Sequence, residues 1–127
     1  ERFNSMEKAL ELRQNGGIEM FQASNVPQFE EIINGQRNDK TLIVYATHTL
    51  YQFSPENRQD FFNMLDRIGK KRDFHFLSVE STRYLQEKYK SSQTVIELTN
   101  YSNGQKIEKF IAETNGHGNW VRWNNKF

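Results

Sequence analysis

The fold of this chain is decided by residues 41–56, which read Thr41-Leu-Ile-Val-Tyr-Ala-Thr-His-Thr-Leu-Tyr-Gln-Phe-Ser-Pro-Glu56. The β-branched, apolar run at 42–45 predicts a buried strand. Ser54 and Pro55 are then typical of the N-cap and the first position of a helix. Since ligands bind at the carboxyl ends of strands in open α/β sheets, the polar loop between this strand and this helix is the predicted binding site.

Helices and strands alternate along most of the sequence. Apolar spacing predicts three helices, at 3–13, after a cap at Ser24 or Asn25, and at 55–70, and three strands, at 18–21, 42–45 and 74–79. A short helix also fits 81–92. Two further strands, at 94–101 and 106–113, flank Asn103-Gly104, a dipeptide typical of a tight hairpin. This order predicts one α/β domain over residues 1–127, with a mostly parallel sheet and a C-terminal antiparallel hairpin.

Composition excludes several classes of function. The 127 residues include 17 basic and 16 acidic side chains, so no net field attracts nucleic acid or an anionic membrane. The chain has no cysteine, which excludes disulfides, thiolate catalysis and cysteine metal sites. The absence of cysteine also makes a cytoplasmic location the expected one. No apolar run approaches the ~20 residues that cross a bilayer, so we expect no membrane segment. Because the chain begins at Glu1, without methionine, we expect it to be part of a longer protein.

Three segments resemble an uncharacterised bacterial domain-of-unknown-function family of methyltransferase-like proteins. The residues Val44-Tyr-Ala-Thr-His-Thr-Leu-Tyr-Gln-Phe-Ser54 are similar to a family motif of the type Val-Phe-His-Ser-His-Thr-Leu-Asn-Gln-Phe-Ser. The end of the chain, Ile111-Ala-Glu-Thr-Asn-Gly-His-Gly-Asn-Trp-Val-Arg-Trp123, is similar to the family's closing Asp-Gly-His-Gly-Arg-Trp-Leu-Glu-Trp. The opening helix at 1–12 also resembles the family. The chain departs from the pattern at Ala23, Ala46 and Asn115.

The resemblance implies a partial Rossmann-like sheet of the class I S-adenosylmethionine-dependent methyltransferase type. On that basis the chain is the C-terminal part of a larger protein and supplies the third to the seventh strand. The glycine-rich cofactor loop would precede Glu1, since Gly16-Gly17 follows a helix rather than a strand. We therefore expect S-adenosylmethionine to bind the full-length protein, and this chain alone to bind no cofactor and to be inactive.

The polar loops carry the candidate site residues. His48 is the candidate general base, because imidazole titrates near neutral pH, and His117, between Gly116 and Gly118, is the second candidate catalytic residue. The candidate substrate-binding residues are Thr47, Thr49, Gln52 and Trp120. The alternative is that His48 is an ordinary loop histidine and that His117 lies in a plain turn, with Trp120 and Trp123 packed in the core.

Other polar residues have simpler interpretations. His75 alternates with apolar side chains on a predicted strand and is expected to be structural, whereas Glu80 is either a catalytic acid or solvated. Two histidines without adjacent carboxylates predict no metal site. The basic run at 70–72 complements a helix dipole, so we do not expect nucleic-acid binding.

Three functions stay open at this point. The first is the substrate side of a methyltransferase-like domain acting on a small-molecule or macromolecular substrate. The second is a non-catalytic interaction module, or a diverged Rossmann-like module without cofactor, that self-associates through an exposed sheet edge. The third is a small-ligand hydrolase that uses His48 and His117.

Overall fold

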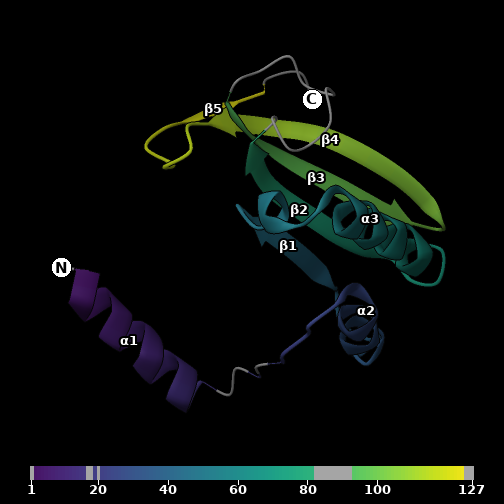
Figure 1. Ribbon diagram of the computed structural model, residues 1–127, viewed down its shortest axis with the longest axis horizontal. Coiled ribbons are helices and arrows are strands. Elements are labelled where there is room, and N and C mark those ends of the chain that lie inside the picture. The colour runs from purple at the N-terminus through teal and green to yellow at the C-terminus, as the bar shows by residue number, and fades with distance from the viewer. Residues whose placement is uncertain (1, 17–18, 20, 82–92, 125–127) are drawn as a thin grey trace.

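The computed structural model describes residues 2–16, 19, 21–81 and 93–124. The described residues form one sheet of five strands in the order β1-β2-β3-β4-β5 (Figure 1). The strands are β1 (Ile43–Thr47), β2 (Phe74–Ser81), β3 (Thr94–Ser102), β4 (Gln105–Thr114) and β5 (Val121–Trp123). Only β1 and β2 pair in parallel within this part of the chain, and the other three pairings are antiparallel.

The prediction of a mostly parallel sheet is therefore wrong. Parallel neighbours need a long crossover, and a helix supplies one only between β1 and β2. The β3–β4 connection is the predicted tight turn, in which Asn103 (φ 51°) and Gly104 (φ 74°) both adopt the left-handed conformation. The C-terminal antiparallel hairpin is thus confirmed, and β5 extends it by a third strand that the sequence did not predict.

Four helices accompany the sheet in the described residues: α1 (Arg2–Asn15), α2 (Val26–Asn34), the short 3₁₀ helix η1 (Leu50–Gln52) and α3 (Pro55–Gly69). The predicted caps are confirmed: Asn25 Oδ1 accepts a hydrogen bond from the Gln28 N–H, and Ser54 Oγ accepts one from the Asn57 N–H. None of the described helices has the length and the apolar character needed to cross a bilayer.

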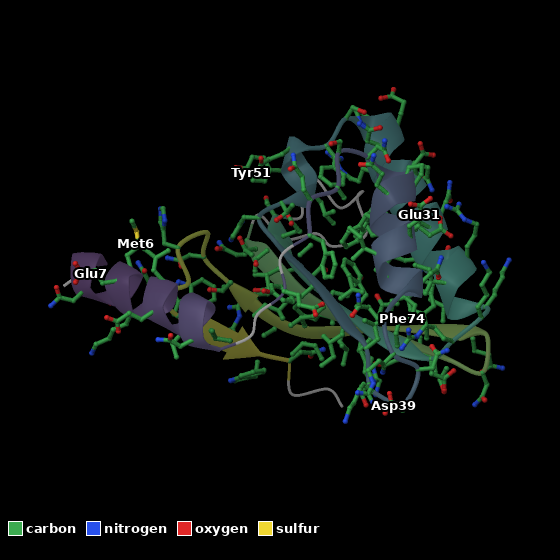
Figure 2. All side chains as sticks on the ribbon, turned by 90° about the horizontal axis from the view of Figure 1, so that it is seen from below. Met6, Glu7, Glu31, Asp39, Tyr51 and Phe74 are labelled. Atoms are coloured by element: carbon green, nitrogen blue, oxygen red, sulfur yellow. The ribbon has the colours of Figure 1, made fainter. Side chains whose placement is uncertain are left out.

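α1 lies apart from the sheet (Figure 1). Its helical conformation is as predicted, but Met6 and Leu10 of the expected inward face are exposed. Figure 2 shows Met6 away from the side chains gathered around Phe74. The predicted strand at 18–21 is not found in the residues described there, because neither Glu19 nor Phe21 lies in a strand. The helix considered at 81–92 lies outside the described residues, except for Ser81, which ends β2.

The hydrophobic core lies between α2, α3 and one face of β1, β2 and β3. Phe61 of α3 is central to it, with ring centroids about 6 Å from those of Phe29, Phe53 and Phe76. At the far end of α3, the Tyr101 ring stacks on Phe74 with a centroid separation of 4.5 Å. Burial and the hydrogen bond that Tyr101 donates to Asp66 raise the pKa of the Tyr101 hydroxyl. These contacts fix α3 along the sheet, with its N-terminus near the carboxyl end of β1.

The tryptophans do not pack in the core, so that interpretation is wrong. Trp120 and Trp123 are 41% and 64% exposed. The physical reason is the position of β5, which pairs only with β4 and lies at the sheet edge farthest from β1. The loop at 115–120 connects two antiparallel neighbours, so it is a turn between strands.

Candidate functional site

The two loops that carry the candidate histidines lie at the same end of the sheet. Thr47 pairs with Val79 near the end of β2, and Ser81, Thr94 and Thr114 pair in succession across the next strands. His48 follows β1 and His117 follows β4. Since β2 and β3 separate those two strands, their ends are roughly 14 Å apart. The structure brings the two residues to one rim of the sheet, with two strand ends between them.

His48 shapes the loop through its backbone. Its φ of 48° lies in the left-handed region, which is uncommon for a residue with a side chain, and its N–H donates to the Val79 carbonyl at 2.9 Å. The Thr49 hydroxyl donates to the Thr47 carbonyl at 3.0 Å, and the Gln52 amide donates to the His48 carbonyl at 3.4 Å. Two of the predicted substrate-binding side chains thus hydrogen-bond the loop itself, while Thr47 is exposed.

Glu80 explains why the loop turns in this way. Its side chain is fully buried, and Oε1 accepts hydrogen bonds from the Thr49 N–H at 2.7 Å and the Leu50 N–H at 3.0 Å. Oε2 is buried too and has no hydrogen-bond partner among the described residues. The interpretation of Glu80 as a solvated side chain is therefore wrong. The alternation in β2 carries the signal, because Phe74, Phe76 and Glu80 all face the helices.

A cavity of about 410 Å³ opens at the carboxyl end of β1, between the N-termini of α2 and α3; we call it the β1 pocket. Its apolar walls come from β1, α2, η1 and α3: Val26, Phe29, Val44, Ala46, Leu50, Phe53 and Phe61. The other lining residues are Ala23, Tyr45 and the polar residues Ser24, Asn25, Thr49 and Asn57. Of the predicted site residues, Thr49 alone lines it. The sequence had indicated a cap, not a ligand, at Ser24 or Asn25, and it had not pointed to Asn57.

An ion pair fastens the two helices that form the β1 pocket. Arg67 of α3 contacts the carboxylate of Glu30 of α2 at 2.6 Å. The hydrogen bond from Arg67 lowers the pKa of the Glu30 carboxyl below its ordinary value, and the charge of Arg67 contributes in the same direction. The pocket walls are therefore held together by charge as well as by the aromatic contacts of Phe61.

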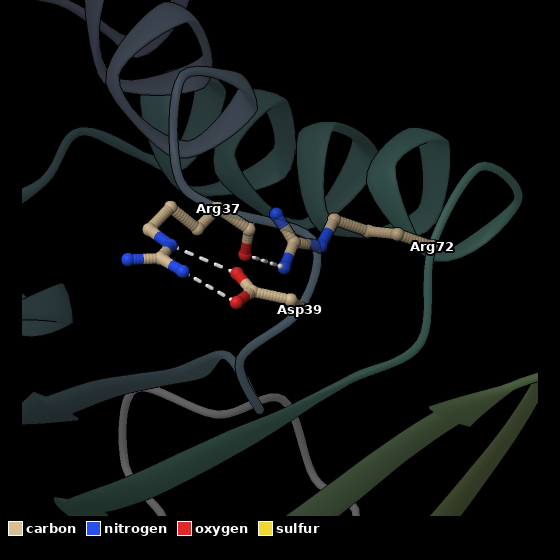
Figure 3. A network of polar contacts seen from close by, with 3 residues as sticks. All are labelled: Arg37, Asp39 and Arg72. Atoms are coloured by element: carbon tan, nitrogen blue, oxygen red, sulfur yellow. Dashed lines mark hydrogen bonds and ion pairs between the residues drawn. The ribbon is translucent and has the colours of Figure 1, made fainter.

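The basic run at 70–72 stabilises the fold at the opposite end of the sheet, through the hydrogen bonds of Arg72. The Arg72 guanidinium donates to the Gln36 and Arg37 carbonyls, both at 3.2 Å, while Arg37 pairs with Asp39 at 2.5 Å (Figure 3). A second cavity, of about 670 Å³, lies here among polar side chains. Arg72 thus braces the loop between α2 and β1. His75 has a comparable role, because its Nδ1 lies 2.7 Å from Asn100 Oδ1 on the neighbouring strand.

The exposed His117 loop is stabilised by its own backbone. Gly118 N–H donates to the Asn115 carbonyl at 3.0 Å and Asn119 N–H donates to Asn115 Oδ1 at 2.9 Å, with Gly118 at φ 68°. The Thr114 hydroxyl donates to the Trp120 carbonyl. No cluster of three or more His, Asp or Glu side chains suited to a metal ion occurs in the part of the chain that the structure describes.

Fold and pocket together define a mixed α/β domain with a ligand-sized cavity at a strand end. A family model described as "Uncharacterized protein conserved in bacteria (DUF2332)" matches residues 1–123, so the chain belongs to this uncharacterised bacterial family. No curated protein and no solved structure matches the chain.

The strand ends described here do not fit S-adenosylmethionine, the cofactor that the methyltransferase resemblance implies. A glycine-rich turn after a strand is the usual cradle, and β1 leads into His48-Thr49 instead. The backbone N–H groups available there, those of Thr49 and Leu50, already bind Glu80.

Proposed function

We propose that the chain is the substrate-side, C-terminal part of a methyltransferase-like domain in a larger protein, and that the β1 pocket holds the substrate. One observation carries the proposal: the pocket opens at the carboxyl end of β1, the first strand of the β1–α3–β2 unit. Ligands of α/β sheets bind at this position. The motif at 44–54 supports the proposal further, because Thr49, Leu50 and Phe53 within it line the pocket.

Each predicted site residue has a proposed role that depends on its position along the end of the sheet. His48 is the proposed base: it directly precedes the pocket-lining Thr49 and does not itself line the β1 pocket, so it would act on the part of a substrate that reaches the loop. Thr47 and Gln52 would orient the substrate near the loop, and His117 and Trp120 would bind the part of a larger substrate that reaches across the rim. S-adenosylmethionine would bind residues outside this chain, so the chain alone would have no activity.

Calorimetric titration with S-adenosylmethionine tests the proposal. The full-length protein should bind the cofactor with measurable heat, while residues 1–127 alone should give none. The matched control is S-adenosylhomocysteine, the demethylated product, which should also bind the full-length protein. A folded full-length sample that gives no heat with either compound would remove the methyltransferase reading.

A second candidate function is a non-catalytic module that pairs with a second copy of itself. It is favoured by large apolar side chains on β1, a strand at the edge of the sheet, where Ile43 and Tyr45 are 59% and 72% exposed. An open edge strand with such side chains promotes strand pairing between chains. Sedimentation velocity at rising concentration should then show a dimer, and replacing Tyr45 by Lys should abolish it. A strictly monomeric profile at high concentration would contradict this function.

A further inference from the structure

We propose that the β1 pocket recognises a small, uncharged aromatic molecule that carries a hydrogen-bonding oxygen, such as a phenol. This inference rests on the proposed function for the role of that molecule, which would be the methyl acceptor. The chemistry of the pocket itself carries the inference, through the size of the cavity, the charge of its lining and the position of its polar groups.

The size of the cavity limits the ligand. A volume of about 410 Å³ is at the lower end of the range for small-molecule sites. At roughly 30 Å³ per water-sized group, the cavity accommodates on the order of a dozen non-hydrogen atoms. Such a volume fits one or two fused rings and excludes a nucleotide or a peptide as the whole occupant.

Among the residues that the structure describes, no charged side chain lines the pocket. Its thirteen lining residues include no Lys, Arg, Asp, Glu or His. The Arg58 guanidinium, next in sequence to the lining residue Asn57, donates from Nε to the Leu50 carbonyl and from Nη2 to the Phe53 carbonyl, both at 3.0 Å. The Glu80 carboxylate binds the backbone N–H groups of the lining residues Thr49 and Leu50 through Oε1. A charged ligand would lose hydration here without a compensating charge, so a neutral one is favoured.

The walls favour an aromatic ring. Phe61 stacks on Phe29 at an interplanar angle of 25° and meets Phe53 edge-on at 87°, and all three line the pocket. A flat ligand can add to this arrangement through the same stacked and edge-on geometries. Val44 and Ala46 of β1 supply a smooth apolar surface beneath it.

The polar groups favour an oxygen on that ring. Asn57 lies in the first turn of α3, where its backbone N–H donates to Ser54 Oγ and its side chain lines the pocket. Asn25 caps α2 through Oδ1, which leaves its side-chain N–H groups as donors. Both residues lie at helix N-termini, where the helix dipole favours a partial negative charge. Both residues are also exposed, so water can satisfy these donors when the pocket is empty, and a hydroxyl or carbonyl oxygen of the ligand takes the place of that water.

Binding of three naphthalene probes to residues 1–127 tests the inference. 2-Naphthol is neutral, 2-naphthoate is an anion and 2-naphthylmethylamine is a cation of similar size at pH 7. We expect saturable binding of 2-naphthol, with amide NMR shifts concentrated at Ser24, Asn25, Thr49 and Asn57, and at least tenfold weaker binding of both charged probes. A charged probe that binds as tightly as 2-naphthol, or shifts that map elsewhere, would overturn the inference.

Two substitutions on α3 sharpen the test. Asn57→Leu should weaken 2-naphthol at least fivefold and leave plain naphthalene unaffected, because only the oxygen uses the amide. Asn63→Leu is the matched control, because Asn63 is exposed on the same helix and lies outside the pocket. Replacing its side chain should not change the affinity for 2-naphthol. Equal weakening by both substitutions would contradict a role for Asn57. Failure of the S-adenosylmethionine titration does not affect this test, since the probes bind without cofactor.

Discussion

The Glu80 carboxylate binds the backbone N–H of Thr49 at 2.7 Å, across 31 residues of sequence. This contact joins the end of β2 to the loop that leaves β1, and the same oxygen also binds the N–H of Leu50. The wall of the β1 pocket formed by Thr49 and Leu50 thus depends on a side chain that does not line the pocket.

Replacing Glu80 by Ala should therefore lower the free energy of unfolding by about 3 kcal/mol, because two N–H groups lose their acceptor in a buried site. Urea denaturation measures this. Glu80→Gln is the control, since its amide oxygen still accepts both hydrogen bonds, and it should cost about 1 kcal/mol. Equal losses for the two variants would show that the acceptor is not what stabilises the loop.

Gly69 is the second position where the structure tolerates little change. A Cβ there would lie 2.1 Å from a ring carbon of Tyr101, which itself is fixed between Phe74 and Asp66. Gly69→Ala should destabilise the protein by about 2 kcal/mol although Ala favours helix. Gly35→Ala, where the nearest atoms lie at 3.5 Å and φ is −73°, should be neutral or slightly stabilising. Thermal melting curves of the two variants compare them directly.

The Glu30–Arg67 ion pair predicts a pH dependence. Because the pKa of Glu30 is lower in the folded state than its ordinary value of 4.5, the pair contributes stability above that pH and loses it as the pH falls through the folded-state pKa. Glu30→Gln should therefore be less stable than the parent at pH 7, and the difference should shrink as the pH falls below 4.5 and vanish once it lies below the lowered folded-state pKa of Glu30. Chemical denaturation at several pH values measures it. Glu31→Gln, an exposed neighbour on α2, should leave the pH profile unchanged.

Gly104 in the β3–β4 turn is a third glycine whose replacement should change the stability in a predictable way. Gly104 has φ 74°, a conformation that costs an L residue about 1 kcal/mol, and no other atoms lie within 4 Å of a Cβ there. Gly104→Ala should lower the free energy of unfolding by that amount through backbone strain alone. Gly116→Ala also meets open space, without a positive φ, and should have no effect. A loss of stability in Gly116→Ala as large as that in Gly104→Ala would contradict this explanation.

Local signals in the sequence predicted the elements well. Capping residues at Asn25 and Ser54 and the turn at Asn103-Gly104 fix helices and hairpin through contacts within a few residues. Strand direction was predicted wrongly, because pairing depends on where each connection passes in space and not on the pattern within a strand. β5 was missed because its three residues, Val121–Trp123, are too few to establish a strand period in the sequence.

The sequence pointed to the loop that borders the β1 pocket, but not to most of the residues that line this pocket. The loop after β1 does border a pocket, through Thr49. The other polar groups of the pocket come from helix N-termini, where sequence indicates only capping or no role at all, and His48 acts on the loop through a backbone angle that no composition reveals. Glu80 was recognised as an acid near a strand end; the alternation in β2 indicates its burial, but its partners, the N–H groups of residues 49 and 50, could not be predicted from the sequence.

Every wall of the β1 pocket comes from residues 23–61, whereas the carboxylate that fixes its loop comes from residue 80. During synthesis the N-terminal part of a chain leaves the ribosome first. A nascent chain that has exposed all the residues lining the pocket still lacks β2, the strand beside β1. It also lacks the Glu80 carboxylate, which accepts hydrogen bonds from the N–H groups of Thr49 and Leu50. The cavity is consequently completed late, when β2 emerges. A truncated chain that ends before Glu80 would contain all the residues that line the β1 pocket but would not form the cavity.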